Sequence, residues 1–191
     1  MRVPLFPLNA VLFPGGVLPL RVFETRYMDM ARECLKNKTA FGVCLIREGR
    51  EVGSPAVPHP VGCLAGIARW DMPQLGVLQL RTIGQERFRI LESQSTAQGL
   101  LIGEVDVLAA EHDCPVPRDY VRWAELLRRT IEGQAEELFS PPYRYDSAAW
   151  VGYRVAEISP LPLQKKQELL EMNDGVARLS ALREILEGPR R

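Results

Sequence analysis

The chain has 191 residues, and its content of 46% hydrophobic and 25% charged residues is that of an ordinary globular protein. This length suits one domain, or two small ones packed together, with a core that needs no metal or disulfide. The 24 basic and 24 acidic residues give a net charge of zero, which argues against general nucleic-acid binding, because phosphate contacts require clustered positive charge.

An uncharged, proline-rich run occupies residues 3–20. It is long enough to suggest a membrane span or a signal peptide, but each proline inside a helix costs about 3 kcal/mol, and no small-residue cleavage site follows. The run must therefore be extended and folded back on itself. We predict short strands at 11–13 and 17–20, which the prolines would confine to sheet edges or bulges. Between them, Pro14 and Gly15 predict a type II turn with Gly15 at positive φ.

The next part of the chain combines one helix with several strands. Apolar residues at three- and four-residue spacing predict a helix over 23–37. Short apolar or alternating runs predict strands over 41–46, 61–70, 77–83, 87–93 and 100–108. Residues 71–76 are predicted to form a turn. The polar, glycine- and proline-rich residues 48–60 are expected to form a loop, which is where a variable functional segment is most often found.

From residue 111 onward the pattern is helical. Residues 111–117 are predicted to form a linker. The predicted helices cover 119–138, 147–158, 162–172 and 174–186. The first has an apolar stripe that consists of Tyr120, Trp123, Leu126, Leu127, Ile131, Ala135 and Leu138. Ser147 and Asp174 are predicted to cap the second and fourth helices.

The cysteines and histidines give a weak signal for a metal site. No cysteine lies in a Cys-x-x-Cys pair, so we expect free thiols; the four are Cys34, Cys44, Cys63 and Cys114. Two further pairings could supply the halves of a zinc site, namely His59 with Cys63 and His112 with Cys114. Their spacing matches no common zinc motif, so no bound metal and no cofactor is predicted.

The sequence shows no established catalytic motif. It has neither a Gly-x-x-x-x-Gly-Lys-Ser/Thr phosphate loop nor a Gly-x-Ser-x-Gly nucleophile elbow. Glu104 and Asp106 share one strand face and could form an acid–base pair, but a solvent-facing strand edge is the favoured interpretation. A cluster of arginines, Arg81, Arg87 and Arg89, could bind a carboxylate or phosphate; we expect them to be solvent-facing partners of nearby acidic residues.

Three segments, in order, resemble the N-terminal domain of Lon proteases. Residues 4–24 read PLFPLNAVLFPGGVLPLRVFE, which is similar to that family's apolar opening, its Leu-Phe-Pro-Gly turn and its Phe-Glu helix start. Residues 82–92 read TIGQERFRILE and resemble the family's Gly-x-x-Arg-Phe-x-Ile strand. Residues 160–171 read PLPLQKKQELLE and resemble its helical part. The resemblance covers nearly the whole chain.

The resemblance implies an α+β fold. We expect a PUA-like β-pseudobarrel with one early helix over residues 1–112, followed by a C-terminal helical bundle over residues 113–191 that packs on it. Because the ATPase and Ser–Lys peptidase modules of Lon cannot fit after Arg191, the chain is expected to be a stand-alone, non-enzymatic member of the family. No catalytic residue is carried over.

The resemblance also implies a function. The family's N-domain engages substrates, so we expect a cytoplasmic, membrane-free protein that binds unfolded polypeptide or acts as an adaptor for a partner protein, as a monomer or weak homo-oligomer. Nucleic acid is not expected as a partner. The alternative is a small-ligand or RNA-binding module, because the family's barrel is similar to that of certain RNA-modification domains. An enzyme with an unrecognised site is a third hypothesis.

A polypeptide-binding surface requires apolar side chains that are left out of the core. The candidates lie at predicted turns and strand ends; they are Phe13, Leu18, Trp70, Met72 and Leu75. Arg69 and Arg81 could flank such a patch and engage peptide carbonyls or acidic residues. The alternative is that all five apolar residues are interior, as such residues often are.

Overall fold

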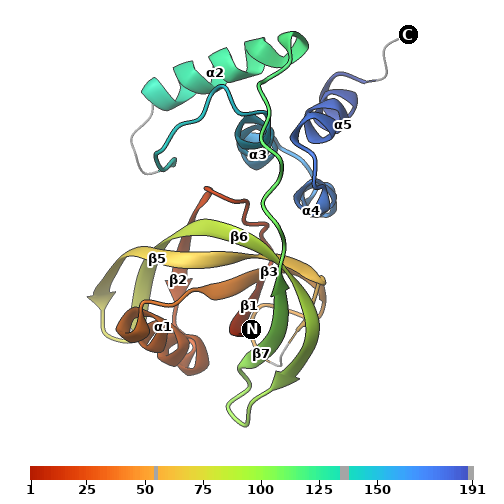
Figure 1. The fold of residues 1–191 in the computed structure, drawn as a ribbon. Coiled ribbons are helices and arrows are strands. Elements are labelled where there is room, and N and C mark those ends of the chain that lie inside the picture. Colours follow the sequence, from red (N-terminus) through yellow and green to blue (C-terminus); the bar gives the residue numbers. More distant parts are fainter. Residues whose placement is uncertain (54–55, 134–137, 189–191) are drawn as a thin grey trace. The chain divides into compact units, whose positions relative to one another are not determined.

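The computed structural model describes residues 1–53, 56–133 and 138–188. The chain divides into two compact units, Met1–Ala109 and Ala110–Arg191. Strands make up most of the first unit and helices the second (Figure 1). The predicted domain limits, 1–112 and 113–191, place Glu111 in the first domain. Its side chain, however, pairs with Arg178 of the second unit, as described below. In other respects these limits stay a prediction.

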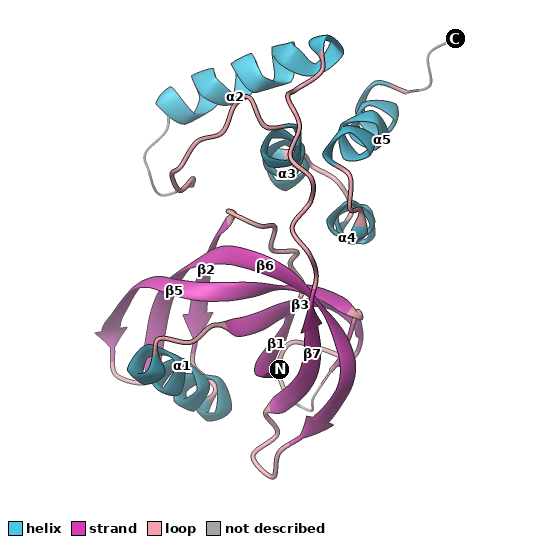
Figure 2. Ribbon diagram, in the orientation of Figure 1, coloured by secondary structure: helices cyan, strands magenta, loops and turns pink. Residues whose placement is uncertain are grey.

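The first unit is built on a closed ring of strands (Figure 2). The ring consists of β1 (Arg2–Leu8), β7 (Leu101–Val107), β6 (Val77–Ser95), β5 (Val61–Gln74) and β3 (Phe41–Glu48). Neighbours in this order are antiparallel, and a parallel pairing of β1 with β3 closes the ring. The short β4 (Val57–Pro58) pairs with β3, and β2 (Val17–Val22) pairs with β6. This confirms the expected β-pseudobarrel.

The first strand differs from the prediction in its position. Residues 11–13 form no strand, and the strand that precedes the turn is β1, which contains Pro4 and Pro7. β7 pairs with residues 2–5 of β1 and β3 pairs with residues 5–8. Apart from Leu5, each residue of β1 therefore pairs with only one neighbouring strand. Each half of β1 is thus locally an edge strand, which tolerates a proline.

The predicted turn around Gly15 is confirmed. Gly15 has φ 72°, and the N–H of Gly16 donates to the carbonyl of Phe13 at 2.9 Å, as a type II turn requires. The turn is held against β6, because Gly15 donates to the Gly84 carbonyl at 2.8 Å and Gly84 donates to the Gly16 carbonyl at 2.9 Å. These bonds draw the residues before the turn into the core rather than into a strand.

The helix α1 (Thr25–Asn37) packs its apolar face against the barrel. Tyr27 stacks on Phe6 with 3.9 Å between ring centroids, and Met30, Ala31 and Cys34 are buried in the same cluster. The helix begins two residues later than predicted, with Glu24 at the N-cap, so Phe23 lies outside it and is exposed. A second cluster, around Phe88 and Leu5, fills the other part of the ring.

The second unit is helical, as predicted. It consists of η1 (Arg118–Tyr120), α2 (Val121–Glu132), α3 (Ala148–Ile158), α4 (Leu163–Glu171) and α5 (Gly175–Glu187). Both predicted caps are confirmed, since Ser147 accepts a hydrogen bond from the Trp150 N–H at 3.1 Å and Asp174 accepts one from the Ala177 N–H at 2.9 Å.

The α2 helix ends at Glu132, earlier than predicted. Gly133 follows the helix. It interrupts the predicted helical pattern, because glycine is the poorest helix former after proline. The predicted stripe is buried at Tyr120, Trp123, Leu127 and Ile131, but Leu126 and Leu138 are exposed. Ala135 lies outside the described residues.

A buried arginine organises the second unit. The Arg178 guanidinium pairs with Glu111 through Nη1 at 2.9 Å and Nη2 at 2.5 Å, and it lies over the Tyr153 ring at 3.9 Å. It also donates to the carbonyls of Leu169 and Met172. Arg178 is thus enclosed with several hydrogen-bond acceptors, which is the arrangement that a buried charge requires.

The helices of the described residues were compared with the length and apolarity that a membrane span requires. None of them is long and apolar enough to cross a bilayer.

Candidate functional site

Three strand segments extend sideways from the closed ring, and we call them the outer sheet. It consists of β2, residues 67–74 of β5 and residues 77–83 of β6. The first half of β6 lies in the middle, with β2 on one side and β5 on the other. Residues directly opposite one another on antiparallel strands share a face, so the register assigns each side chain to one of two faces.

One face of the outer sheet is apolar and packs against α1. Trp70 of β5 lies opposite Leu80 of β6, which lies opposite Leu20 of β2. The residues of the outer sheet that belong to or pack on the α1 cluster are Leu18, Leu20, Val22, Ile67, Met72, Leu78 and Leu80. Trp70 is 55% exposed, because this part of β5 pairs with β6 alone and forms the edge of the sheet.

The opposite face of the outer sheet is polar. Arg69 lies opposite Arg81, which lies opposite Pro19. In the next row of this face, Asp71 lies opposite Gln79, which lies opposite Arg21. Arg81 is half-buried and the other side chains of these two rows are exposed. The outer sheet therefore presents guanidinium groups on one side and apolar groups at the rim of the other.

The structure removes Phe13 from the surface candidates. Its side chain is fully buried, so the expectation that it is left out of the core is wrong. The physical reason is the tight approach of the turn to β6: a Cβ on Gly84 would lie 2.1 Å from the Phe13 carbonyl oxygen. Sequence alone gives no sign of this approach, because the two segments lie far apart in the chain.

The other candidates are distributed over three places. Leu18 and Met72 are half-buried and pack on the α1 cluster. Leu75, in the β5–β6 turn beside Gly76 at φ 82°, is 93% exposed. Arg69 and Arg81 lie on the other face of the sheet from Trp70, so they do not flank it on one surface.

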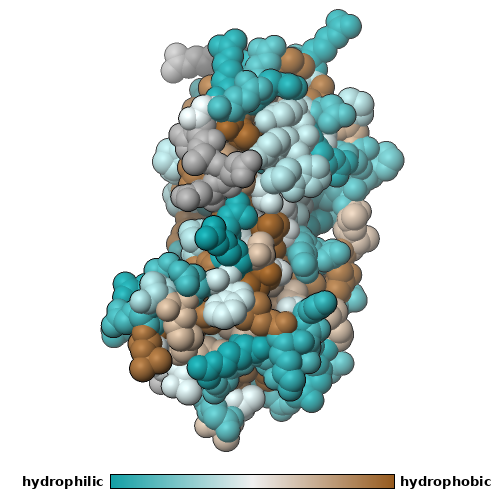
Figure 3. Space-filling view, turned by 90° about the vertical axis from the view of Figure 1, so that its left-hand side faces the viewer, coloured by the Kyte–Doolittle hydropathy of each residue, from teal (hydrophilic) through white to brown (hydrophobic). Residues whose placement is uncertain are grey.

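We call Trp70, Met72 and Leu75 the apolar rim. Figure 3 shows this side of the first unit, where brown apolar surface lies between teal polar side chains.

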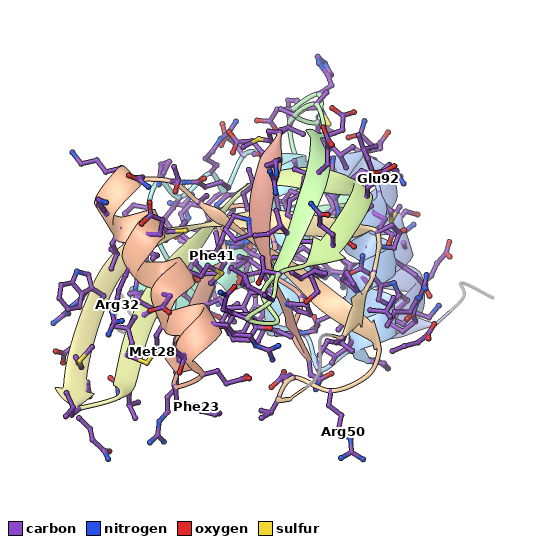
Figure 4. All side chains as sticks on the ribbon, turned by 90° about the horizontal axis from the view of Figure 1, so that it is seen from below. Phe23, Met28, Arg32, Phe41, Arg50 and Glu92 are labelled. Atoms are coloured by element: carbon purple, nitrogen blue, oxygen red, sulfur yellow. The ribbon has the colours of Figure 1, made fainter. Side chains whose placement is uncertain are left out.

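A pocket of ≈ 580 Å³ lies at the start of α1. Its lining residues are Phe23, Glu24, Thr25, Arg26, Gly53, Ala97, Gln98 and Gly99. Arg26 donates to the Gly99 carbonyl at 2.8 Å and to Glu24 at 2.9 Å, which ties the helix start to the β6–β7 turn. Figure 4 shows Phe23 beside the start of α1 and Arg50 on the loop that follows β3.

Sequence reasoning missed this pocket, because it placed Phe23 inside the helical stripe. The predicted functional loop over 48–60 contributes Gly53 to the lining. Burial raises the pKa of the Tyr27 hydroxyl. The Arg26 guanidinium, 4.7 Å from the ring centroid, lowers this pKa, but the effect of burial is the larger one. Tyr27 therefore stays a neutral core residue next to the pocket.

The described residues contain no group of three or more His, Cys, Asp or Glu side chains that could hold a metal ion. Cys34, Cys44 and Cys63 are buried, and burial raises the pKa of the Cys44 thiol well above its ordinary value. A raised pKa lowers the thiolate fraction and with it the reactivity of the thiol. These cysteines are therefore core residues.

The predicted carboxylate pair is exposed. Glu104 lies opposite Arg2 on β1 and opposite Glu92 on β6, and Asp106 lies opposite Arg89. Exposed carboxylates beside arginines agree with the interpretation as a solvent-facing strand. Arg87, by contrast, is buried, which corrects the expectation that it faces solvent.

The chain was compared with known protein families and curated proteins. Residues 2–188 match the family described as the ATP-dependent protease La (LON) substrate-binding domain. The Lon protease of Anaeromyxobacter dehalogenans is 26% identical over 98% of this chain, and the match covers 23% of that protein. The protein cereblon of Gallus gallus is 27% identical over 68% of this chain and 28% of its own length. The chain thus spans about a quarter of the length of these relatives.

Solved structures agree with this assignment. The crystal structure of a Lon N-terminal domain protein from Xanthomonas campestris superimposes with a TM-score of 0.79 at 37% identity, covering 95% of this chain and 96% of that one. The N-terminal domain of the Mycobacterium avium complex Lon protease has the same fold, with a TM-score of 0.65 at 18% identity over 96% and 97% of the two chains. This chain therefore belongs to the family of Lon substrate-binding domains.

Proposed function

We propose that this protein binds unfolded, extended polypeptide through the apolar rim of the outer sheet. The observation that carries the proposal is the exposure of two large apolar side chains on one hairpin, Trp70 at 55% and Leu75 at 93%. A tryptophan at the edge of a sheet offers a large, rigid contact area, and such residues often dominate the energy of an interface. The family's description as a substrate-binding domain supports this assignment.

The half-buried Met72 adds to the same surface. It follows Trp70 by two residues and packs on the α1 cluster, so it connects the exposed rim to the core. A flexible thioether side chain adapts to apolar groups of different shape. A rim of this composition suits a partner that is recognised by apolar character rather than by one sequence, as an unfolded polypeptide is.

The proposal includes a non-catalytic role in the cytoplasm, as an adaptor or a binding domain for protein substrates. The matched family model is that of a substrate-binding domain, which supports binding rather than chemistry. The second candidate function is binding of a small ligand in the pocket at the start of α1. This pocket is wide open to solvent, so it supports this function less than the apolar rim supports the first.

The test is a titration with a labelled, unstructured peptide that is rich in leucine and phenylalanine and has no acidic residue. The double variant Trp70→Ala/Leu75→Ser should bind it about thirtyfold more weakly or worse, as expected from a loss of ~2 kcal/mol at an interface hot spot. Moderate salt should leave the affinity of the unaltered protein nearly unchanged, because apolar contact is not screened.

The matched control is Leu91→Ser. Leu91 lies on β6 in the same unit and is 61% exposed, but it is outside the apolar rim, so its replacement should leave binding unchanged. Equal weakening by both variants would refute the assignment of the rim. Salt-sensitive binding of single-stranded RNA without binding of the peptide would favour an RNA-binding module instead.

A further inference from the structure

The polar face of the outer sheet concentrates positive charge in a protein whose net charge is zero. Arg69 and Arg81 lie directly opposite each other, and Arg21 lies in the neighbouring row of the same face. In the described residues of these two rows, three guanidinium groups stand against the one carboxylate of Asp71. The Asp71 carboxylate also accepts the N–H of Met72 at 2.8 Å.

This arrangement differs from two arginines of the closed ring. Arg2 lies opposite Glu104, and Arg89 lies opposite Asp106. Like charges directly opposite each other destabilise an antiparallel pair. The Arg69–Arg81 pair places two like charges side by side, and the row it occupies ends at Pro19, which brings no compensating charge.

Two of the three arginines keep their charge available. Within residues 1–53, 56–133 and 138–188, neither Arg21 nor Arg69 has an ion pair, and both are exposed. Many other arginines of the described chain are paired with carboxylates; they are Arg26, Arg32, Arg47, Arg122, Arg144, Arg154, Arg178 and Arg183. Arg81 is half-buried and has further contacts in the fold, so it is a fixed member of the cluster.

We propose that this arginine face binds an acidic segment of a partner polypeptide. Guanidinium groups bind carboxylates through two parallel hydrogen bonds. Side chains on one face of a strand recur every two residues, about 7 Å apart, and the carboxylates of an extended segment with acidic residues at alternate positions recur at the same spacing. Arg81 and Arg21 lie diagonally on neighbouring strands in consecutive rows, about 7–8 Å apart, and Arg69 lies directly beside Arg81.

The face suits a polypeptide better than a nucleic acid. Binding of single-stranded nucleic acid relies on aromatic side chains that stack on bases, whereas the nearest tryptophan of the outer sheet, Trp70, lies on the other face. The proposal does not rest on the apolar rim, because the two surfaces are opposite faces of one sheet and can be tested independently.

The experiment titrates the protein with a labelled peptide in which aspartate and glutamate alternate with serine, and with a matched peptide that has asparagine and glutamine instead. We expect the acidic peptide to bind more tightly, and the double variant Arg21→Gln/Arg69→Gln to weaken it by about tenfold or more. The charge-retaining variant Arg21→Lys/Arg69→Lys should weaken it less, since lysine keeps the charge but loses the bidentate geometry. Arg81 is left unchanged because of its contacts in the fold.

The matched control is Arg32→Gln/Arg50→Gln, which removes the same charge from exposed positions of the first unit and should change the affinity less than about threefold. The proposal is overturned if the acidic peptide binds no better than the amide peptide, if the control pair weakens it equally, or if single-stranded RNA binds more tightly with the same dependence on Arg21 and Arg69. The Trp70→Ala/Leu75→Ser variant should keep its affinity for the acidic peptide, so a failure here is distinct from a failure of the apolar rim.

Discussion

The two halves of strand β5 are both extended but have opposite surroundings. Residues 61–65 are all buried, whereas residues 66–74 are half-buried or exposed. The first half lies between β3 and β6 inside the closed ring, with one core cluster on each face. The second half pairs with β6 alone. A single strand thus contributes to the core at one end and to the candidate site at the other.

The difference shows where sequence change is tolerated. In residues 61–65, both faces of β5 are packed, so a side chain there cannot change size without a cost in free energy. On the outer sheet, one face is packed against α1 and the other faces solvent. Functional residues can accumulate on the solvent-facing side at little cost to core packing. The following predictions test this contrast, from the largest expected change in unfolding free energy to the smallest.

Phe88→Ala should destabilise the protein most. Phe88 is fully buried in the ring, and truncation of a buried phenylalanine costs about 3–5 kcal/mol. The matched control is Leu91→Ala on the same strand, where the side chain is 61% exposed and the change should stay within about 0.5 kcal/mol. Urea unfolding followed by circular dichroism measures both. Similar midpoints for the two variants would contradict the assignment of Phe88 to the packed interior of the ring and of Leu91 to its solvent-facing side.

Gly62→Ala and Gly66→Ala compare the two halves of β5 directly. A Cβ on Gly62 would lie 2.5 Å from the Val43 carbonyl oxygen and 2.7 Å from the Phe88 ring, so we expect a loss of about 2–3 kcal/mol from overpacking. A Cβ on Gly66 would lie 2.5 Å from the end of the Gln85 side chain, which is exposed and can move. The same unfolding experiment should show a much smaller change for Gly66→Ala, and equal losses would refute the comparison.

Gly15→Val should cost about 1–2 kcal/mol, because the residue has φ 72° and a β-branched side chain is strained in that region. Gly15→Asn is the control, since asparagine adopts positive φ far more readily. The turn precedes β2, so this pair tests whether the outer sheet depends on it. A valine variant as stable as the asparagine variant would show that the turn conformation adjusts freely.

Local signals in the sequence predicted local structure well. The Pro14–Gly15 turn and the caps Ser147 and Asp174 follow from the chemistry of a few neighbouring residues, and all are confirmed. The pseudobarrel was inferred from the family resemblance. The strand pattern alone did not reveal β1, because its partners β3 and β7 come later in the chain and a proline-rich strand has no distinctive local signature.

The exposure of the candidate side chains was predicted in part. Trp70 and Leu75 are exposed, as a site at strand ends requires. Phe13 is buried by an approach to Gly84 that no local pattern reveals. The separation of Arg69 from Trp70 follows from the alternation of a strand, but their assignment to a particular face depends on a register shift between Ile67 and Arg69, and register shifts are tertiary features.

The enclosed pair of Arg178 and Glu111 has a consequence for dividing the chain into fragments. A helical fragment that begins at residue 113 would lack Glu111 and leave the guanidinium of Arg178, whose side chain is fully buried, without its carboxylate. Removal of one partner of a buried ion pair costs about 3–5 kcal/mol, which is a large part of the stability of a small domain. A fragment that begins at Ala110, the first residue of the second unit, keeps the pair, and it is the segment on which isolated folding of the helices should be attempted.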